Sequence, residues 1–123
     1  MLMSASQPAL TNSERVRAMS AKLPESIERF EDSYPAVWDA FMQLGDKCHK
    51  AGPLDEKTRR LVKIALAIGA GLEGGAHSAV RNAKAAGVAV DEMRHVAVLS
   101  ITTLGLPAAM RGLSWIDDAT KPR

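Results

Sequence analysis

Apolar residues recur at steps of three and four along most of the chain, which is the period of one face of an α-helix. Pro24 predicts the start of the first long helix, because proline is favoured in a first helical turn. Pro35 lies inside the same pattern and predicts a kink or a split near Ser33, since proline lacks the N–H that a helix interior needs. The loop 51–53 ends this region. Its apolar positions are Ile27, Phe30, Tyr34, Val37, Phe41, Leu44 and Cys48.

Two helices are predicted in the middle of the chain. Asp55 is the expected N-cap of the first, because its carboxylate can accept a backbone N–H of the opening turn. The second is expected over 76–86, with Gly87 as its left-handed C-cap. Four glycines in the run 69–75 permit a bend or a close backbone approach between the two. The expected buried positions are Leu61, Ile64, Ala65 and Ile68 in the first helix, and Ala76, Ala79, Val80 and Ala83 in the second.

Two further helices complete the pattern. The acids Asp91 and Glu92 predict the first turn of a helix that ends at Gly105, and Pro107 predicts the start of a short last helix. No segment alternates as a half-buried strand does. The sequence therefore predicts an all-α, single-domain protein, with an N-terminal arm at 1–24, a helical domain at 25–118 and a tail at 119–123.

Composition limits the class of protein. The 123 residues are 46% hydrophobic but only 4% aromatic, which predicts a thin core of small side chains that is completed by burial against other subunits. A net charge of +2 with both signs interspersed argues against nucleic-acid binding. Neither a signal peptide nor a long uncharged apolar stretch is present, so we expect no membrane association. The single cysteine, Cys48, excludes an intrachain disulfide and fits a reducing cytoplasmic location.

Three segments, in order, resemble the carboxymuconolactone decarboxylase / alkylhydroperoxidase D family. They are Leu54-Asp55-Glu56-Lys57-Thr58-Arg59, Ala83-Lys84-Ala85-Ala86-Gly87 with acids after it, and Thr103-Leu104-Gly105-Leu106-Pro107-Ala108-Ala109-Met110. With the flanking helices, the resemblance covers about 25–118. It implies an orthogonal helical bundle of the alkylhydroperoxidase D-like type, assembled as a homotrimer or homohexamer.

The peroxidase branch of this family implies a glutamate, a Cys-x-x-Cys pair and a histidine. Counting back from Gly87, these positions are occupied here by Arg60, Leu72, Gly75 and Ala79. Two small or apolar residues cannot cycle electrons, and the Arg60 guanidinium stays protonated, so it cannot act as a base. The resemblance therefore implies a divergent site without Cys-x-x-Cys peroxidase chemistry.

The candidate catalytic residues are His77 and Glu73, which are spaced i, i+4 and can meet on one helical face. Glu73 would orient the imidazole, and Arg60 would bind the carboxylate of a ligand. On this interpretation the protein performs acid/base chemistry, of decarboxylase or lyase type, on a small anionic metabolite. Each residue also has a purely structural interpretation: an exposed histidine, an acid favoured by the helix dipole, and a surface or interface arginine.

Two other hypotheses remain open. The first is a non-catalytic oligomeric scaffold or small-ligand-binding module, since all four reactive positions of the peroxidase branch are changed. The second is a weak, peroxiredoxin-like peroxidase activity through Cys48 alone. His49 and His95 are expected at the surface. The three histidines lack metal-ligand spacing, so neither a metal nor a cofactor is expected.

Overall fold

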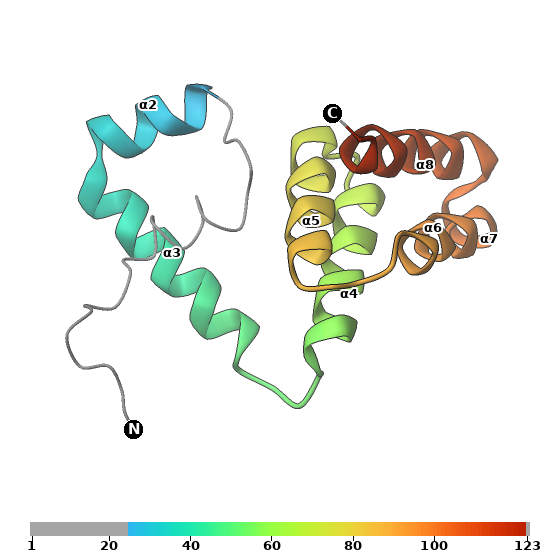
Figure 1. The fold of residues 1–123 in the computed structure, drawn as a ribbon, viewed down its shortest axis with the longest axis horizontal. Helices are drawn as coiled ribbons and strands as arrows, with labels where there is room; N and C mark the ends of the chain where they lie inside the picture. The colour runs from blue at the N-terminus through green and yellow to red at the C-terminus, as the bar shows by residue number, and fades with distance from the viewer. Residues whose placement is uncertain (1–24, 123) are drawn as a thin grey trace. The chain divides into compact units, whose positions relative to one another are not determined.

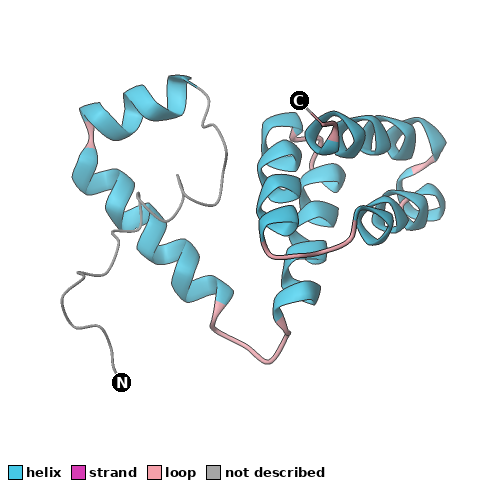
Figure 2. Cartoon of the chain, in the orientation of Figure 1, coloured by secondary structure: helices cyan, strands magenta, loops and turns pink. Residues whose placement is uncertain are grey.

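A computed structural model describes residues 25–122, and this part of the chain consists of helices and loops without a strand (Figures 1 and 2). The all-α prediction is confirmed. The chain divides into two compact units, Met1–Gly52 and Pro53–Arg123. This boundary falls inside the range 25–118, so the single domain stays a prediction. The predicted N-terminal arm, 1–24, lies outside the described residues.

The first unit contains α2 (Glu25–Ser33) and α3 (Pro35–His49). Pro35 opens α3, so the predicted split of the first apolar series is confirmed. Across the junction Tyr34 N–H donates to the Phe30 carbonyl at 2.8 Å, and its own carbonyl accepts from Trp38 N–H at 3.0 Å. Trp38 is the one buried side chain of the described part of this unit, 7% exposed, with the rings of Phe30 and Phe41 at 6.4 and 6.1 Å between centroids.

The second unit contains five helices, α4 (Glu56–Gly69), α5 (Glu73–Ala85), α6 (Val90–Leu99), α7 (Ile101–Leu104) and α8 (Leu106–Thr120). In Figure 1, α5 lies against α4 and α8, and α6 lies against α4 and α8. The core between them combines a few branched side chains with small ones. Its buried members are Ile64, Ile68, Val80, Ala83, Val88, Met93, Ala97 and Ile116.

Small residues bring α8 close to α4. A Cβ built on Gly112 of α8 would lie 2.9 Å from two side-chain carbons of Ile68, so the helices approach at a distance that only glycine permits. Next to Ile68 on α4, Ala67 packs with Ala76 of α5 and Trp115 of α8 in a second, smaller cluster. The predicted reliance on small side chains is therefore present inside this unit.

Two predicted helix ends are confirmed in detail. The Asp55 carboxylate accepts the Thr58 N–H at 2.8 Å, and this bond holds the pKa of Asp55 below its ordinary value. Gly87 has φ +86°; its N–H donates to Lys84 O and that of Val88 to Ala83 O, each at 3.0 Å. These two bonds form a Schellman motif, and Val88 is buried behind it.

Several boundaries differ from the predictions. Ser100 interrupts the helix expected up to Gly105, because its Oγ donates to the Ala97 carbonyl at 2.6 Å and competes with the helical pattern there. α5 begins at Glu73 rather than at residue 76. α8 has 15 residues and is not the short helix expected.

The buried stripe of α4 also differs from the prediction by one position. Ala67 is buried and Ala65 is exposed, so the face toward α5 and α8 is rotated from the predicted one. Among the described residues, no helix combines the length and the apolar character needed to cross a bilayer.

Candidate functional site

The predicted His77–Glu73 pair is not formed. Both residues lie on α5, but no hydrogen bond or ion pair between described residues joins them. Glu73 is the first residue of the helix and is exposed. The helix dipole and water stabilise an acid at this position, so Glu73 needs no side-chain partner. His77 is half-buried beside Ala76, which is fully buried. Its Nε2 atom is buried and has no hydrogen-bond partner among the described residues.

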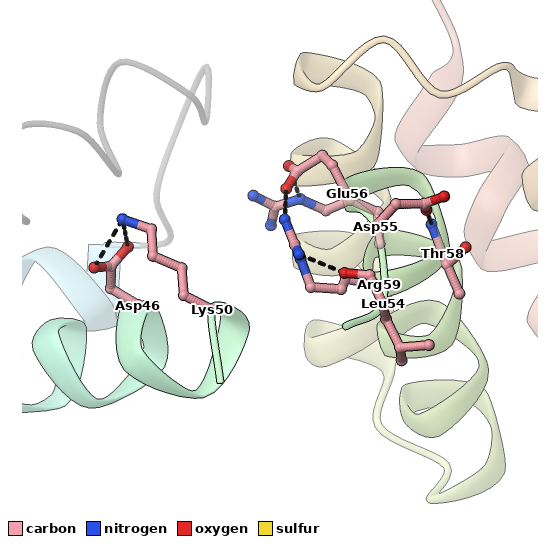
Figure 3. A network of polar contacts seen from close by, with 8 residues as sticks. Asp46, Lys50, Leu54, Asp55, Glu56, Thr58 and Arg59 are labelled. Carbon is pink, nitrogen blue, oxygen red and sulfur yellow. Dashed lines mark hydrogen bonds and ion pairs between the residues drawn. The ribbon is translucent and has the colours of Figure 1, made fainter. Parts of the chain in front are cut away.

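Arg60 is held by an acid of its own helix. Its Nε donates to Glu56 Oε2 at 2.9 Å, and its side chain is only 17% exposed. The other oxygen of Glu56 accepts from Arg59 at 2.8 Å, and Arg59 also donates to the Leu54 carbonyl at 2.5 Å (Figure 3). One carboxylate therefore partly neutralises two guanidinium groups in the first turn of α4. Arg60 is less suited to anchoring a ligand than the sequence suggested.

The positions that the predicted register assigns to the peroxidase cysteines, Leu72 and Gly75, lie at the start of α5. Leu72 is the N-cap residue; its side chain is 56% exposed and provides no capping hydrogen bond. A Cβ on Gly75 would lie 3.2 Å from the Leu72 Cβ, so the two positions are adjacent in space as well as in the motif. The opening N–H groups of α5 therefore face no side-chain acceptor at the N-cap, an arrangement with positive electrostatic potential.

Arg111, on α8, was missed by the sequence analysis. Its guanidinium carbon lies 5.4 Å from the ring centroid of Trp115 in a cation–π contact. Its Nη2 atom comes within 4.0 Å of the Cβ position of Gly71, in the turn just before α5. No carboxylate of the described part of the chain pairs with it. The i, i+4 spacing of Arg111 and Trp115 was visible in the sequence, but the contact with the turn depends on tertiary packing.

A separate, mainly apolar groove of about 840 Å³ lies over α4, α6 and α7. His77, Glu73 and Arg60 are not among its lining residues. His95 is exposed, as expected, and lies on the groove. The lining consists of Thr58, Leu61, Val62, Ala65, Leu66, Ile68, Gly69, Ala70, Glu92, His95, Val96, Leu99, Ser100, Thr103 and Leu104.

Two ion pairs connect helices of the second unit. Lys57 Nζ lies 2.9 Å from Glu92 Oε2, joining α4 to α6, and Glu92 also accepts the Ala89 N–H at 3.2 Å. The Lys57 hydrogen bond is the main cause that lowers the pKa of Glu92, and the same bond raises the pKa of Lys57. Arg94 pairs with Asp117, joining α6 to α8, and this hydrogen bond raises the pKa of Arg94.

The remaining candidates do not form a reactive cluster. Cys48 is a free, exposed thiol on α3. No group of three or more His, Cys, Asp or Glu side chains within residues 25–122 is placed to hold a metal ion.

The helical architecture and the arrangement at the start of α5 can now be set beside known proteins. The sequence model of the carboxymuconolactone decarboxylase family matches residues 35–118, which extends from α3 into α8. The chain belongs to the carboxymuconolactone decarboxylase family, and the resemblance drawn from the sequence is confirmed. No curated protein and no solved structure shows significant similarity to the chain.

Proposed function

We propose that the protein binds a small anionic metabolite at the start of α5 and that His77 transfers a proton in an acid/base reaction of decarboxylase or lyase type. The observation that carries the proposal is the buried, partnerless Nε2 of His77. A buried polar atom without a hydrogen bond costs about 1–3 kcal/mol, and bound ligand would supply the missing partner.

The charge at this end of α5 supports an anionic ligand. The opening N–H groups of the helix attract negative charge, and Gly74 and Gly75 leave the backbone bare of side chains. Arg111 lies beside the preceding turn without a carboxylate partner among the described residues. We therefore place the carboxylate anchor at Arg111 in preference to Arg60, whose charge is shared with Glu56.

The proposed reaction requires that His77 Nε2 donate one proton to the substrate. In a decarboxylation the C–C bond to the carboxylate breaks, CO₂ leaves, and the electron pair stays on the remaining carbon. Protonated His77 would donate its Nε2 proton to that carbon and regain a proton from water. Glu73 lies one turn away on α5 and is exposed. Its side chain would have to move toward His77 before it could return a proton to the imidazole.

The experiment is an NMR titration of the full chain with succinate, a small dicarboxylate probe, followed at the histidine ring signals. We expect the His77 signals to shift with a saturable dependence, and the shift to be lost in Arg111→Gln. The His95 signals serve as the internal control, since His95 lies on the separate groove. Absence of any saturable change at His77 contradicts the proposal.

A non-catalytic ligand-binding module is the second candidate. It is favoured by the chemistry of Leu72, Gly75 and Ala79, none of which carries a reactive group. The two candidates separate on His77→Gln. If His77→Gln loses succinate binding and the wild type does not turn over lactone-acid substrates, the module is favoured. If the wild type turns them over and His77→Gln does not, the enzyme is favoured.

A further inference from the structure

We propose that α2–α3 of one copy docks its apolar stripe into the α4/α6/α7 groove of a second copy, and that the second copy returns the same contact. The stripe is defined as Phe30, Tyr34, Val37, Phe41 and Leu44. The groove is the one of about 840 Å³ described above. The inference does not depend on the proposed function, because the groove and the start of α5 have no residue in common.

The groove exposes side chains that are normally buried. Leu66 and Leu99 are each 62% exposed, and Val62 and Leu104 are each 40% exposed. Contiguous apolar patches of this kind mark interaction surfaces in soluble proteins. Since α4 carries the groove on one side and its buried residues Ile64 and Ala67 on the other, the helix is apolar on two faces and requires two partners.

The length and the residue spacing of the stripe match the length of the groove. Tyr34, Val37, Phe41 and Leu44 are between 56% and 59% exposed and recur at steps of three and four along one helical face. From Tyr34 to Leu44 the stripe extends about 15 Å along a helix, and the α4 wall of the groove, from residue 58 to 70, extends about 18 Å. An amphipathic helix placed in an apolar groove is a recurrent mode of recognition.

The net charges of the two units are complementary. Residues 25–49 carry six acidic and two basic side chains (Lys and Arg), a net charge of −4, whereas residues 53–123 carry seven acidic and ten basic ones, a net charge of +3. Opposite potentials favour the encounter of the two surfaces and oppose pairing of like with like.

A loop joins the two units. Pro53 disfavours the helical conformation at Gly52, and Asp55 is extended, with φ −74° and ψ 171°. Exchange of identical elements between copies is a low-cost route to oligomers. A stable interface buries about 1,200–2,000 Å² in total, and a contact that is made twice doubles the area buried by one stripe and one groove.

Cross-linking in trans tests the proposal with the full chain. Cys48 follows Leu44 by one turn and is exposed, so it marks the end of the stripe. A wild-type copy is co-expressed with a differently tagged Cys48→Ser/Leu66→Cys copy and treated with a bismaleimide. We expect a covalent heterodimer. The matched control replaces Leu66→Cys with Val98→Cys, which is 52% exposed on α6 but does not line the groove, and should give at least tenfold less product.

Three outcomes overturn the proposal. The first is a wild-type chain that is monomeric by light scattering. The second is equal cross-linking through Val98→Cys. The third is a Leu66→Cys chain that retains Cys48 and links only to itself, which would assign the groove to the chain's own α3.

Matched charge substitutions give an independent measurement. Leu99→Arg and Val98→Arg are neighbours on α6 with similar exposure, but only Leu99 lines the groove. We expect Leu99→Arg to raise the dissociation constant of the oligomer at least tenfold and Val98→Arg to leave it unchanged. Phe41→Arg changes the other partner surface and should have the same effect as Leu99→Arg even if Leu99→Arg fails to fold. An oligomer that persists in Phe41→Arg overturns the proposal.

Discussion

α3 and α4 have nearly the same length, 15 and 14 residues, and both carry an apolar stripe, yet the stripes have different surroundings. α3 buries Trp38 alone, whereas α4 buries Ile64, Ala67 and Ile68 against its neighbours. The period of apolar residues therefore predicts a helix equally well in both cases. It does not indicate whether the partner of that face lies in the same unit.

α5 and α3 also differ in the apolar side chains that they bury and expose. In α5 the buried residues are Ala76, Val80 and Ala83, while Phe41 of α3 is 59% exposed. Apolar burial contributes about 25 cal/mol per Å², so small side chains contribute little each and depend on close backbone approach. The packing of α5 therefore depends on close backbone approach, whereas α3 exposes apolar area.

The largest effect on the free energy of unfolding is expected on α4, where a buried face and an exposed face can be compared. Ile64→Ala should lower the free energy of unfolding by about 2–5 kcal/mol, since Ile64 is fully buried in the core. Leu66→Ala, two residues away and 62% exposed, should cost less than about 1 kcal/mol at low protein concentration. Urea unfolding followed by circular dichroism measures both. Equal losses at high dilution would show that the two faces are equally buried in a single copy.

The second-largest effect on stability is expected at the contact between α8 and α4. Gly112→Ala places a Cβ 2.9 Å from Ile68, and we expect a net loss of about 1–2 kcal/mol, because overpacking outweighs the helical preference of alanine. Gly45→Ala is the matched control on α3, where no atom lies within 4 Å of the new Cβ. It should stabilise by about 0.5–1 kcal/mol. Opposite signs in the two thermal midpoints are expected, and a stabilising Gly112→Ala contradicts the close approach.

The fold was predictable where local chemistry determines it. Pro35, Asp55 and Gly87 act on the backbone within a few residues of themselves, so the split, the N-cap and the C-cap follow from sequence. The break at Ser100 was not predicted, because a serine in a helical pattern can either face solvent or bond back to its own turn. The rotation of the α4 stripe depends on which helices pack against it, which periodicity does not contain.

The candidate site residues were proposed from local spacing. His77 and Glu73 came from their i, i+4 spacing, and Leu72 and Gly75 from the family register. The structure has no hydrogen bond between Glu73 and His77, and Arg60 was assigned to a ligand although Glu56, four residues earlier, was available to bind it. Arg111 was missed because its contact with the turn at Gly71 joins α8 to residues 40 positions away in sequence. Spacing rules detect neighbours on one helix, and this site is assembled from two.

A smaller effect tests the predicted C-cap of α5. Gly87→Ala should cost about 1 kcal/mol, because a residue with a Cβ is strained at φ +86°. Gly87→Asn should lose less, since asparagine tolerates the left-handed region better. The free energies of unfolding in urea measure the difference. If alanine and asparagine are equally tolerated, Gly87 does not hold the left-handed conformation in solution.

The smallest effect concerns an ion pair that joins two helices of the second unit. Arg29–Glu25 and Asp46–Lys50 are local pairs within or at the end of a helix (Asp46 and Lys50 are shown in Figure 3), whereas Lys57–Glu92 joins α4 to α6. The pKa of Glu92 is lowered in the folded state. Its contribution to stability is therefore fully present above the unfolded pKa of about 4.3 and is lost as the pH falls through the lower folded value.

Removal of either partner should change both ends of the pH profile, but by different amounts at the acid end. Glu92→Gln should flatten the acid limb of a urea-midpoint profile. Lys57→Gln should shrink that limb without abolishing it, because the Ala89 N–H still favours the charged Glu92 carboxylate. Lys57, whose pKa is raised, contributes stability below its unfolded pKa that is lost as the pH rises through the folded value, so both variants should also flatten the alkaline limb. An acid limb that is unchanged in Glu92→Gln would contradict the α4–α6 ion pair and leave packing alone to hold α6 on α4.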